Sequence, residues 1–333
     1  MRPTINAMQI CENRGLFVGK IPIDPKASCK EEKAFISHGH SDHVGINKVT
    51  KYYCSNETKD LLEAMGKANG NVSGLALGKG LSLRDSKVSL HNAGHILGSA
   101  QILIEGSKTV AVTSDFKMQD SIIQKGAKPL KSDILVMEST FGLPSYSFPE
   151  REQVYRQIGS FVKNKSKKGF VVLAGYALGK AQELTKVVNE YAGLTPLVHE
   201  RIFKNNQVYE ANGVSLGDYL KLDHNLNESS VLVMPPSLVN HNLLQVLEYS
   251  LHKKIFSGMA TGWGFRNGFD AIFPLSDHAD FSQSMEYVKQ AEPKLVVTMH
   301  GFEKELASYI QRRLGIAARP LGKKGQKTIM EFA

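Results

Sequence analysis

Four side chains suited to binding a metal ion fall within six residues of the sequence. His38, His40, Asp42 and His43 form the pattern His-x-His-x-Asp-His. Imidazole nitrogen and carboxylate oxygen are ligands that zinc prefers in proteins. A single histidine is most often a hydrogen-bonded core residue, but that explanation does not suit three histidines beside an aspartate. We therefore predict a metal site in this segment.

The spacing within this segment favours more than one ion. If residues 37–41 are extended, His38 and His40 point to the same face, because side chains alternate along an extended chain. The simplest arrangement places His38 and His40 on one ion, and Asp42 with His43 on a second ion nearby. Two metal ions a few ångströms apart form the clamp that promotes in-line displacement at phosphorus.

Further candidate ligands lie on either side of this segment. His95 stands between Gly94 and Gly98, which let the backbone approach a site closely, and it is the candidate third nitrogen ligand of the first ion. Asp115 follows twenty residues later, and the two oxygens of its carboxylate could bridge both ions. Asp24 precedes a proline, so it either orients a ligand or forms a turn.

Several candidates come directly after short apolar runs that predict buried strands. The runs span residues 34–36 before His38, 109–112 before Asp115, 134–137 before Glu138 and 295–299 before His300. Layered α/β proteins gather their ligands at the carboxyl ends of such strands. A second histidine near the end of the chain, His278, lies in the motif of residues 276–280.

The stretch between residues 141 and 274 has a different pattern. It predicts helices over residues 150–163, 178–191 and 241–251, and strands over residues 170–174 and 231–234. This alternation is typical of a parallel α/β unit with its own core. Because the stretch supplies almost none of the candidate ligands, we predict an insertion between two halves of a catalytic domain.

At this point the motifs resemble a known family. Residues 37–45, with His95 and Asp115, resemble the metallo-β-lactamase superfamily, an αββα sandwich with a two-metal site. Residues 138–142, 177–183 and 276–280, with His300-Gly301, are similar to signatures of its β-CASP branch, the nucleases of RNA processing and DNA repair. The compact length resembles the short prokaryotic branch, of 3′-end-processing-like factors and ligase-associated exonucleases. The resemblance implies a metallo-β-lactamase domain in two parts, residues 1–141 and 275–333, around a β-CASP domain of residues 142–274.

The resemblance also implies roles for individual residues. Two zinc ions are expected, the first held by His38, His40, His95 and Asp115, and the second by Asp42, His43, His300 and again Asp115. His278, oriented by Glu138, is the expected general acid that protonates the leaving oxygen, and Asp42 is counted with these catalytic residues. The nucleophile is a water that both ions acidify. One departure is Ser114, which stands where most relatives have glycine before the bridging aspartate.

Composition limits the classes of protein to which this chain can belong. The chain has 333 residues, 42% of them hydrophobic and 22% charged, as in an ordinary globular protein, and its net charge of +9 favours a polyanionic partner. Three cysteines without a C-x-x-C motif, a polar N-terminus and the lack of a long apolar run predict a cytoplasmic protein that no membrane holds.

The substrate contacts are predicted from helix chemistry and stacking. Lys180, at the start of a predicted helix, could attract phosphate through its charge and the helix dipole. Trp263 and Arg266 combine an aromatic ring and a cation suited to single-stranded bases. Burial in the core is the equal alternative for Trp263.

We therefore predict a zinc-dependent nuclease of single-stranded nucleic acid. RNA is favoured because His300 is present, whereas DNA-repair members of the family resemble a pattern with an apolar residue there. A DNA exonuclease in end processing is the alternative. A small-molecule hydrolase fits the insertion and the basic charge less well, and a non-catalytic subunit would have lost ligands that this chain keeps. Whether the chain forms a homodimer stays open.

Overall fold

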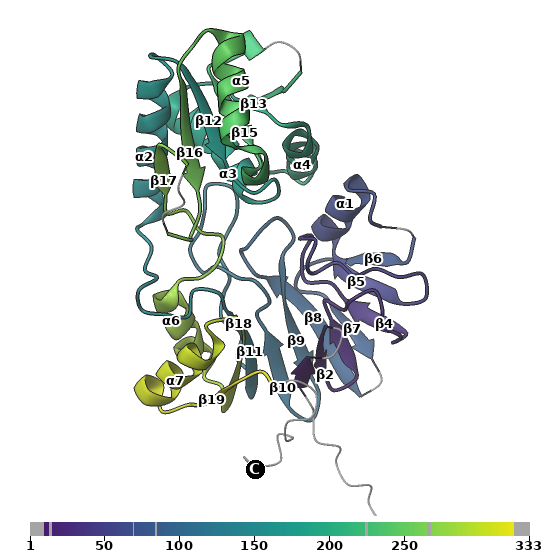
Figure 1. Cartoon of the computed structure of the whole chain (residues 1–333). Helices are drawn as coiled ribbons and strands as arrows, with labels where there is room; N and C mark the ends of the chain where they lie inside the picture. The colour runs from purple at the N-terminus through teal and green to yellow at the C-terminus, as the bar shows by residue number, and fades with distance from the viewer. Residues whose placement is uncertain are drawn as a thin grey trace, which may run out of the picture. The chain divides into compact units, whose positions relative to one another are not determined.

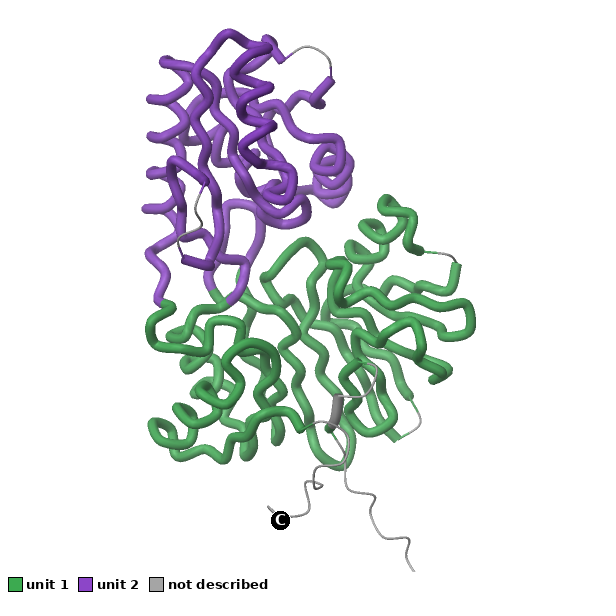
Figure 2. Tube along the Cα trace, viewed as in Figure 1, with its two compact units in different colours: residues 1–118, 126–146, 279–333 green, residues 119–125, 147–278 purple. Residues whose placement is uncertain are grey.

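The computed structural model describes residues 10–12, 15–68, 70–83, 85–223, 226–264 and 268–322 (Figure 1). These residues form two compact units (Figure 2). The first unit comprises Met1–Met118, Gly126–Tyr146 and Ala279–Ala333, and the second comprises Gln119–Lys125 and Ser147–His278. The chain therefore leaves the first unit and returns to it twice.

The first unit contains two β-sheets. The 6-stranded sheet has the order β1 (Ile10–Glu12), β2 (Leu16–Val18), β3 (Ile21–Ile23), β4 (Lys33–Phe35), β5 (Lys51–Ser55) and β6 (Val72–Leu75). The 7-stranded sheet has the order β19 (Ala317–Pro320), β18 (Leu295–Gly301), β11 (Ile134–Ser139), β10 (Thr109–Val112), β9 (Ala100–Glu105), β8 (Ser86–Asn92) and β7 (Gly80–Leu83). In this second sheet β10, β11, β18 and β19 run parallel.

Side chains along strand β10 alternate between two hydrophobic cores, one on each face of the 7-stranded sheet. Val110 and Val112 join Phe35 and Val18 of the other sheet in a core between the two sheets. Ala111 points to the opposite face and packs with residues of α6 (Phe281–Ala291) and α7 (Glu303–Leu314). This period-two division is what a strand buried on both faces requires.

The outer face of the first sheet is covered by α1 (Asn56–Ala64). This helix begins where the Thr58 amide donates to the Ser55 hydroxyl over 3.0 Å, a side-chain cap that the first turn needs. With α6 and α7 on the other outer face, the layers are helix, sheet, sheet and helix. The predicted αββα sandwich is therefore confirmed.

The second unit is a parallel α/β fold. Its 6-stranded sheet has the order β14 (Leu220–Lys221), β13 (Leu197–Val198), β15 (Val231–Met234), β12 (Phe170–Ala174), β16 (Ile255–Ala260) and β17 (Ala271–Phe273). All of its strand pairs are parallel. One face packs against α2 (Arg151–Lys165), α3 (Lys180–Val187) and α4 (Glu200–Ala211), and the other against α5 (His241–Leu251).

Several predicted elements of this unit agree with the structure to within a few residues. The strands predicted over residues 170–174 and 231–234 are β12 and β15, and the helix predicted over 241–251 is α5. The helix predicted over 178–191 is instead α3 followed by a π-helical turn, Val188–Ala192. Within the described residues, no helix combines the length and apolar character needed to cross a membrane.

Candidate metal centre

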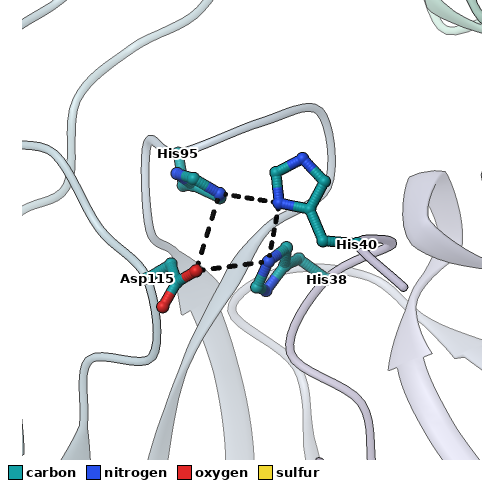
Figure 3. Close-up of side chains that lie close together, drawn as sticks. All are labelled: His38, His40, His95 and Asp115. Atoms are coloured by element: carbon teal, nitrogen blue, oxygen red, sulfur yellow. Dashed lines mark hydrogen bonds and ion pairs between the residues drawn. The ribbon is translucent and has the colours of Figure 1, made fainter. Parts of the chain in front are cut away.

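Three loops that follow strands of the first unit carry four of the predicted ligands (Figure 3). His38 and His40 lie in the loop after β4, His95 in the loop between β8 and β9, and Asp115 in the loop after β10. The strand does not continue through residues 37–41, because β4 ends at Phe35. Instead the loop turns, with the His43 amide donating to the His40 carbonyl over 3.1 Å.

The ligand atoms of these four residues converge. The His38 Nε2 atom lies 3.1 Å from the His40 Nδ1 atom, which is 3.0 Å from His95 Nε2. Asp115 Oδ2 lies 3.5 Å from His38 Nε2 and 3.8 Å from His95 Nε2. All four atoms lie within 4.8 Å of one another. Figure 3 shows these four separations as dashed lines.

These separations fit a tetrahedral zinc site. With zinc–ligand bonds of about 2.0–2.1 Å, the ligand atoms of a tetrahedron lie about 3.3–3.4 Å apart. The four observed separations, from 3.0 to 3.8 Å, bracket that length. Three nitrogens and one oxygen are also a donor set that zinc accepts. The residues present therefore fit the ion that the sequence pattern predicts.

A chain of hydrogen bonds sets the tautomer of His38. The Ser37 hydroxyl donates to Asp24 Oδ2 over 2.6 Å, so its oxygen accepts from His38 Nδ1 at 2.9 Å. The proton is then on Nδ1, and the lone pair of Nε2 faces the cluster. Burial and the neighbouring His43 also hold the pKa of His38 well below its usual range, so the ring is neutral. A neutral imidazole of this tautomer is what a metal requires.

Asp24 also orients His43. Its Oδ2 atom accepts from His43 Nδ1 over 2.8 Å, which leaves Nε2 of His43 3.4 Å from Asp115 Oδ2. Burial lowers the pKa of His43, but the carboxylates of Asp24 and Asp115 outweigh burial and raise it to about 11. The two carboxylates therefore favour positive charge at His43, and a metal ion bound by His43 would displace a proton. Asp24 itself lies at a bend of the chain with φ +47°, and its role at a metal ion stays a prediction.

The second predicted ligand set is gathered less closely. His43 Nε2 lies 3.7 Å from Asp42 Oδ2, and the Asp42 side chain is 82% exposed. The rings of His43 and His300 have centroids 6.3 Å apart. Asp115, the fourth member of this predicted set, has its Oδ2 atom 3.4 Å from His43 Nε2. A second ion bound by these residues stays a prediction.

Glycines make room for the His95 loop. Gly98 has a φ of +72°, and a Cβ there would lie 2.6 Å from both the Ser55 hydroxyl and the Thr58 amide nitrogen. Gly94, with φ +71°, is similarly crowded by the Lys117 carbonyl, at 2.5 Å. The glycines thus let the His95 loop pack closely against the start of α1 and against Lys117, and a larger residue at Gly98 would displace the α1 cap.

Ser114 provides a prediction about stability. Its φ is +51°, a left-handed conformation that costs an L-residue roughly 1–2 kcal/mol, and among the described residues its buried hydroxyl has no hydrogen-bond partner. Glycine tolerates this φ but gains unfolded-state entropy worth roughly 0.5–1 kcal/mol. We expect Ser114→Gly to raise the free energy of unfolding by about 1 kcal/mol in denaturant titration. A decrease would show that the serine is not strained.

Glu138 and His278 occupy different units. Glu138, at the end of β11, is 3% exposed, and it accepts from the Phe116 amide over 2.8 Å and from the Thr140 hydroxyl. His278 is the last residue of the second unit. Its amide donates to the Ser276 hydroxyl over 3.0 Å. The orientation of His278 by Glu138 stays a prediction.

The predicted substrate contacts have different surroundings. Lys180 is 2% exposed, and its ammonium lies 2.7 Å from Asp277 Oδ1, so its described partner is a carboxylate. Trp263 follows β16 and is 37% exposed, which does not fit the alternative of a core residue. Arg266 lies outside the described residues. Contact of any of the three with substrate stays a prediction.

Sequence reasoning missed Ser37 and Thr140, which hold Asp24 and Glu138. Each lies within two residues of a predicted site residue, so the available signal was a hydroxyl next to a candidate. It also missed the buried ion pair that Arg151 forms with Glu183, 32 positions away along the chain. The spacing of two residues so far apart in the sequence does not indicate that they form an ion pair.

Comparison with known proteins adds independent information. Residues 272–319 match the family described as "Zn-dependent metallo-hydrolase RNA specificity domain". The chain is 32% identical over 324 residues to a probable DNA ligase of Opitutus terrae, an alignment that covers 94% of this chain but 31% of the ligase. It is 25% identical over 359 residues to an RNase J-like protein of Methanocaldococcus jannaschii, covering 85% of this chain and 84% of that protein.

A solved structure shares the fold. It is a protein of unknown function from Enterococcus faecalis V583, with a TM-score of 0.61 and 14% identity over 88% of this chain and 80% of that one. This likeness shows only that the fold is shared. The sequence matches described above identify the family. The chain belongs to the β-CASP branch of the metallo-β-lactamase superfamily, a family of zinc-dependent metallo-hydrolases that includes nucleases.

Proposed function

We propose that this chain is a zinc-dependent nuclease that hydrolyses phosphodiester bonds of single-stranded nucleic acid, with RNA as the preferred substrate. The observation that carries the proposal is the convergence of His38, His40, His95 and Asp115 on one point. The match of residues 272–319 to an RNA specificity domain and the RNase J-like relative support RNA. The net charge of +9 suits a polyanion.

In this proposal, different residues of the chain have different roles in phosphodiester hydrolysis. Zinc bound here would acidify a water molecule and neutralise charge on the phosphate. Asp24 holds His43 and, through Ser37, His38 in the tautomers that bind a metal. We propose that Glu138 orients His278, which delivers a proton to the leaving oxygen. A histidine paired with a carboxylate can carry that proton near neutral pH.

A DNA exonuclease is the second candidate. The observation that favours it is the 32% identity to a probable DNA ligase over nearly the whole of this chain. Because the chain spans only 31% of that ligase, the ligase's activity cannot be carried over whole. The two candidates use the same metal centre and differ in whether a 2′-hydroxyl is accepted or required.

Cleavage of two matched substrates tests the proposal. Purified protein is incubated with zinc and end-labelled single-stranded RNA or DNA of one sequence. We expect cleavage of RNA to be faster, His43→Ala to be inactive, and His241→Ala, which changes an exposed histidine of α5, to match the wild type. Faster cleavage of DNA would favour the second candidate. Cleavage of neither substrate, or equal cleavage by His43→Ala, would contradict the nuclease.

Trp263 and Tyr176 give a prediction about substrate binding. They follow the neighbouring parallel strands β16 and β12, and they are 37% and 50% exposed. Stacking of one base on an aromatic ring contributes about 1–3 kcal/mol. We therefore expect Trp263→Ala to raise KM for single-stranded substrate about 5- to 150-fold while kcat stays within about twofold. The matched control is Tyr249→Ala, on α5. Unchanged KM with a lower Tm would instead indicate a packing role.

A further inference from the structure

A buried ion cluster in the second unit has no role in the metal centre. It consists of Arg151, Lys180, Glu183 and Asp277, which are 7%, 2%, 1% and 9% exposed. Arg151 is the first residue of α2, Lys180 and Glu183 lie in the first turn of α3, and Asp277 follows β17. Burial of four ionisable groups is costly unless they are well paired, so the cluster calls for an explanation.

The charges within the cluster are closely paired. Arg151 Nη2 lies 2.6 and 2.5 Å from the two carboxylate oxygens of Glu183, and Arg151 Nε lies 3.1 Å from one of them. The Tyr155 hydroxyl donates to the same carboxylate. Lys180 Nζ lies 2.7 Å from Asp277 Oδ1, an ion-pair distance without hydrogen-bond alignment, and Arg151 Nη2 lies 3.8 Å from Asp277. Two cations thus face two carboxylates.

The cluster ends on the segment that carries His278. Arg151 Nη1 donates to the Ser276 carbonyl over 2.6 Å, and Lys180 faces the next residue, Asp277. The Ser276 hydroxyl accepts from the His278 amide over 3.0 Å and donates to the His278 carbonyl over 2.9 Å. Side chains from α2 and α3 therefore fix both residues that precede His278.

From this arrangement we infer that Arg151 and Lys180 are positioning residues for His278. They hold the backbone of residues 276–278 on the second unit, so that the imidazole is presented in one orientation. Glu183 holds Arg151 in turn. A displacement of about 1 Å in a catalytic group can lower the rate about 10²-fold, so a rigid support affects the rate strongly. The inference rests on the proposed function, in which His278 delivers the proton.

This role differs measurably from a contact between Lys180 and phosphate. A residue that binds substrate directly changes KM, whereas a residue that positions a proton donor changes kcat. We expect Lys180→Met to lower kcat about 10²-fold with KM within about twofold of wild type. The matched control is Lys204→Met, on the exposed side of α4. Lys180→Arg, which keeps a cation beside Asp277, is expected to recover much of the lost rate.

A double-mutant cycle tests whether Lys180 acts through Asp277. Asp277→Asn is expected to lower kcat about as much as Lys180→Met, and the double variant to be no slower than either, because both changes remove one interaction. If the two losses multiply instead, Lys180 acts independently of Asp277 and the inference is wrong. Raised KM with retained kcat would also overturn it, in favour of a phosphate contact.

Hydrogen–deuterium exchange tests the positioning without any activity. In Lys180→Met we expect the amides of residues 276–278 to exchange about tenfold faster than in Lys204→Met, while Tm shows that the unit remains folded. Unchanged exchange in a folded Lys180→Met or Asp277→Asn protein would overturn the inference. If the wild type cleaves neither RNA nor DNA, the proposed function fails, and the exchange result still decides whether the cluster holds this segment.

Discussion

Asp115→Asn is expected to remove phosphodiester cleavage almost completely. Asp115 Oδ2 lies within 3.4–3.8 Å of the ring nitrogens of His38, His43 and His95, so one carboxylate balances three imidazoles. The amide keeps the shape of the side chain but loses its negative charge. Because loss of an outer partner already costs about 10- to 100-fold, loss of this direct ligand should lower kcat by more than about 10²-fold.

Initial rates on end-labelled RNA, measured with zinc in excess, check this expectation. The matched control is Asp120→Asn, an exposed aspartate paired with Lys125, which should retain the wild-type rate. Thermal unfolding of both variants shows whether the fold is kept. An Asp115→Asn protein that is folded and cleaves at the wild-type rate would contradict the assignment of Asp115 as a shared ligand.

The second large effect is expected from Asp24→Asn. The carboxylate of Asp24 accepts from the Ser37 amide at 2.7 Å, the Ser37 hydroxyl at 2.6 Å and His43 Nδ1 at 2.8 Å. An asparagine has one acceptor oxygen in place of two, so it leaves without an acceptor either the Ser37 amide or both the Ser37 hydroxyl and His43 Nδ1, and in both cases the negative charge beside His43 is lost. Because asparagine tolerates the φ of +47° at this position, the substitution adds no backbone strain.

We expect Asp24→Asn to weaken zinc binding and activity about 10- to 100-fold. Titration against a competing chelator measures the affinity, and excess zinc should restore much of the rate. That recovery separates Asp24→Asn from Asp115→Asn, which lacks a ligand and should not recover. An unchanged zinc affinity would show that Asp24 serves the turn alone.

The sequence predicts those parts of the fold that depend on local pattern. The strand predicted over residues 109–112 is β10, because an apolar run of this length bounded by turns indicates a buried strand. His95 and Asp115 come together with His38 and His40 because each follows a strand of the sandwich. The signals from which the sequence predicts this cluster are the closely spaced histidines, the glycines beside His95 and the apolar run before Asp115.

Other features depend on tertiary contacts that no local pattern reveals. The partner of Lys180 is Asp277, and a lysine at the start of a helix gives no sign of such a distant carboxylate. The sequence therefore predicts a lysine that contacts phosphate, whereas the structure pairs this buried lysine with Asp277. In the loop after β4, the sequence predicts that His38 and His40 lie close together, but for a different reason. Alternation along an extended chain predicts it, whereas in the structure the loop turns, with the His43 amide donating to the His40 carbonyl.

Zinc bound per chain tests the central claim most directly. The protein is freed of metal, dialysed against buffered zinc and analysed for metal content, and the same sample is assayed on single-stranded RNA. The account predicts about two zinc ions per chain in the wild type, with cleavage restored as the metal returns. Less than one zinc per chain, with no cleavage after zinc is added, would contradict a metal centre formed by His38, His40, His95 and Asp115.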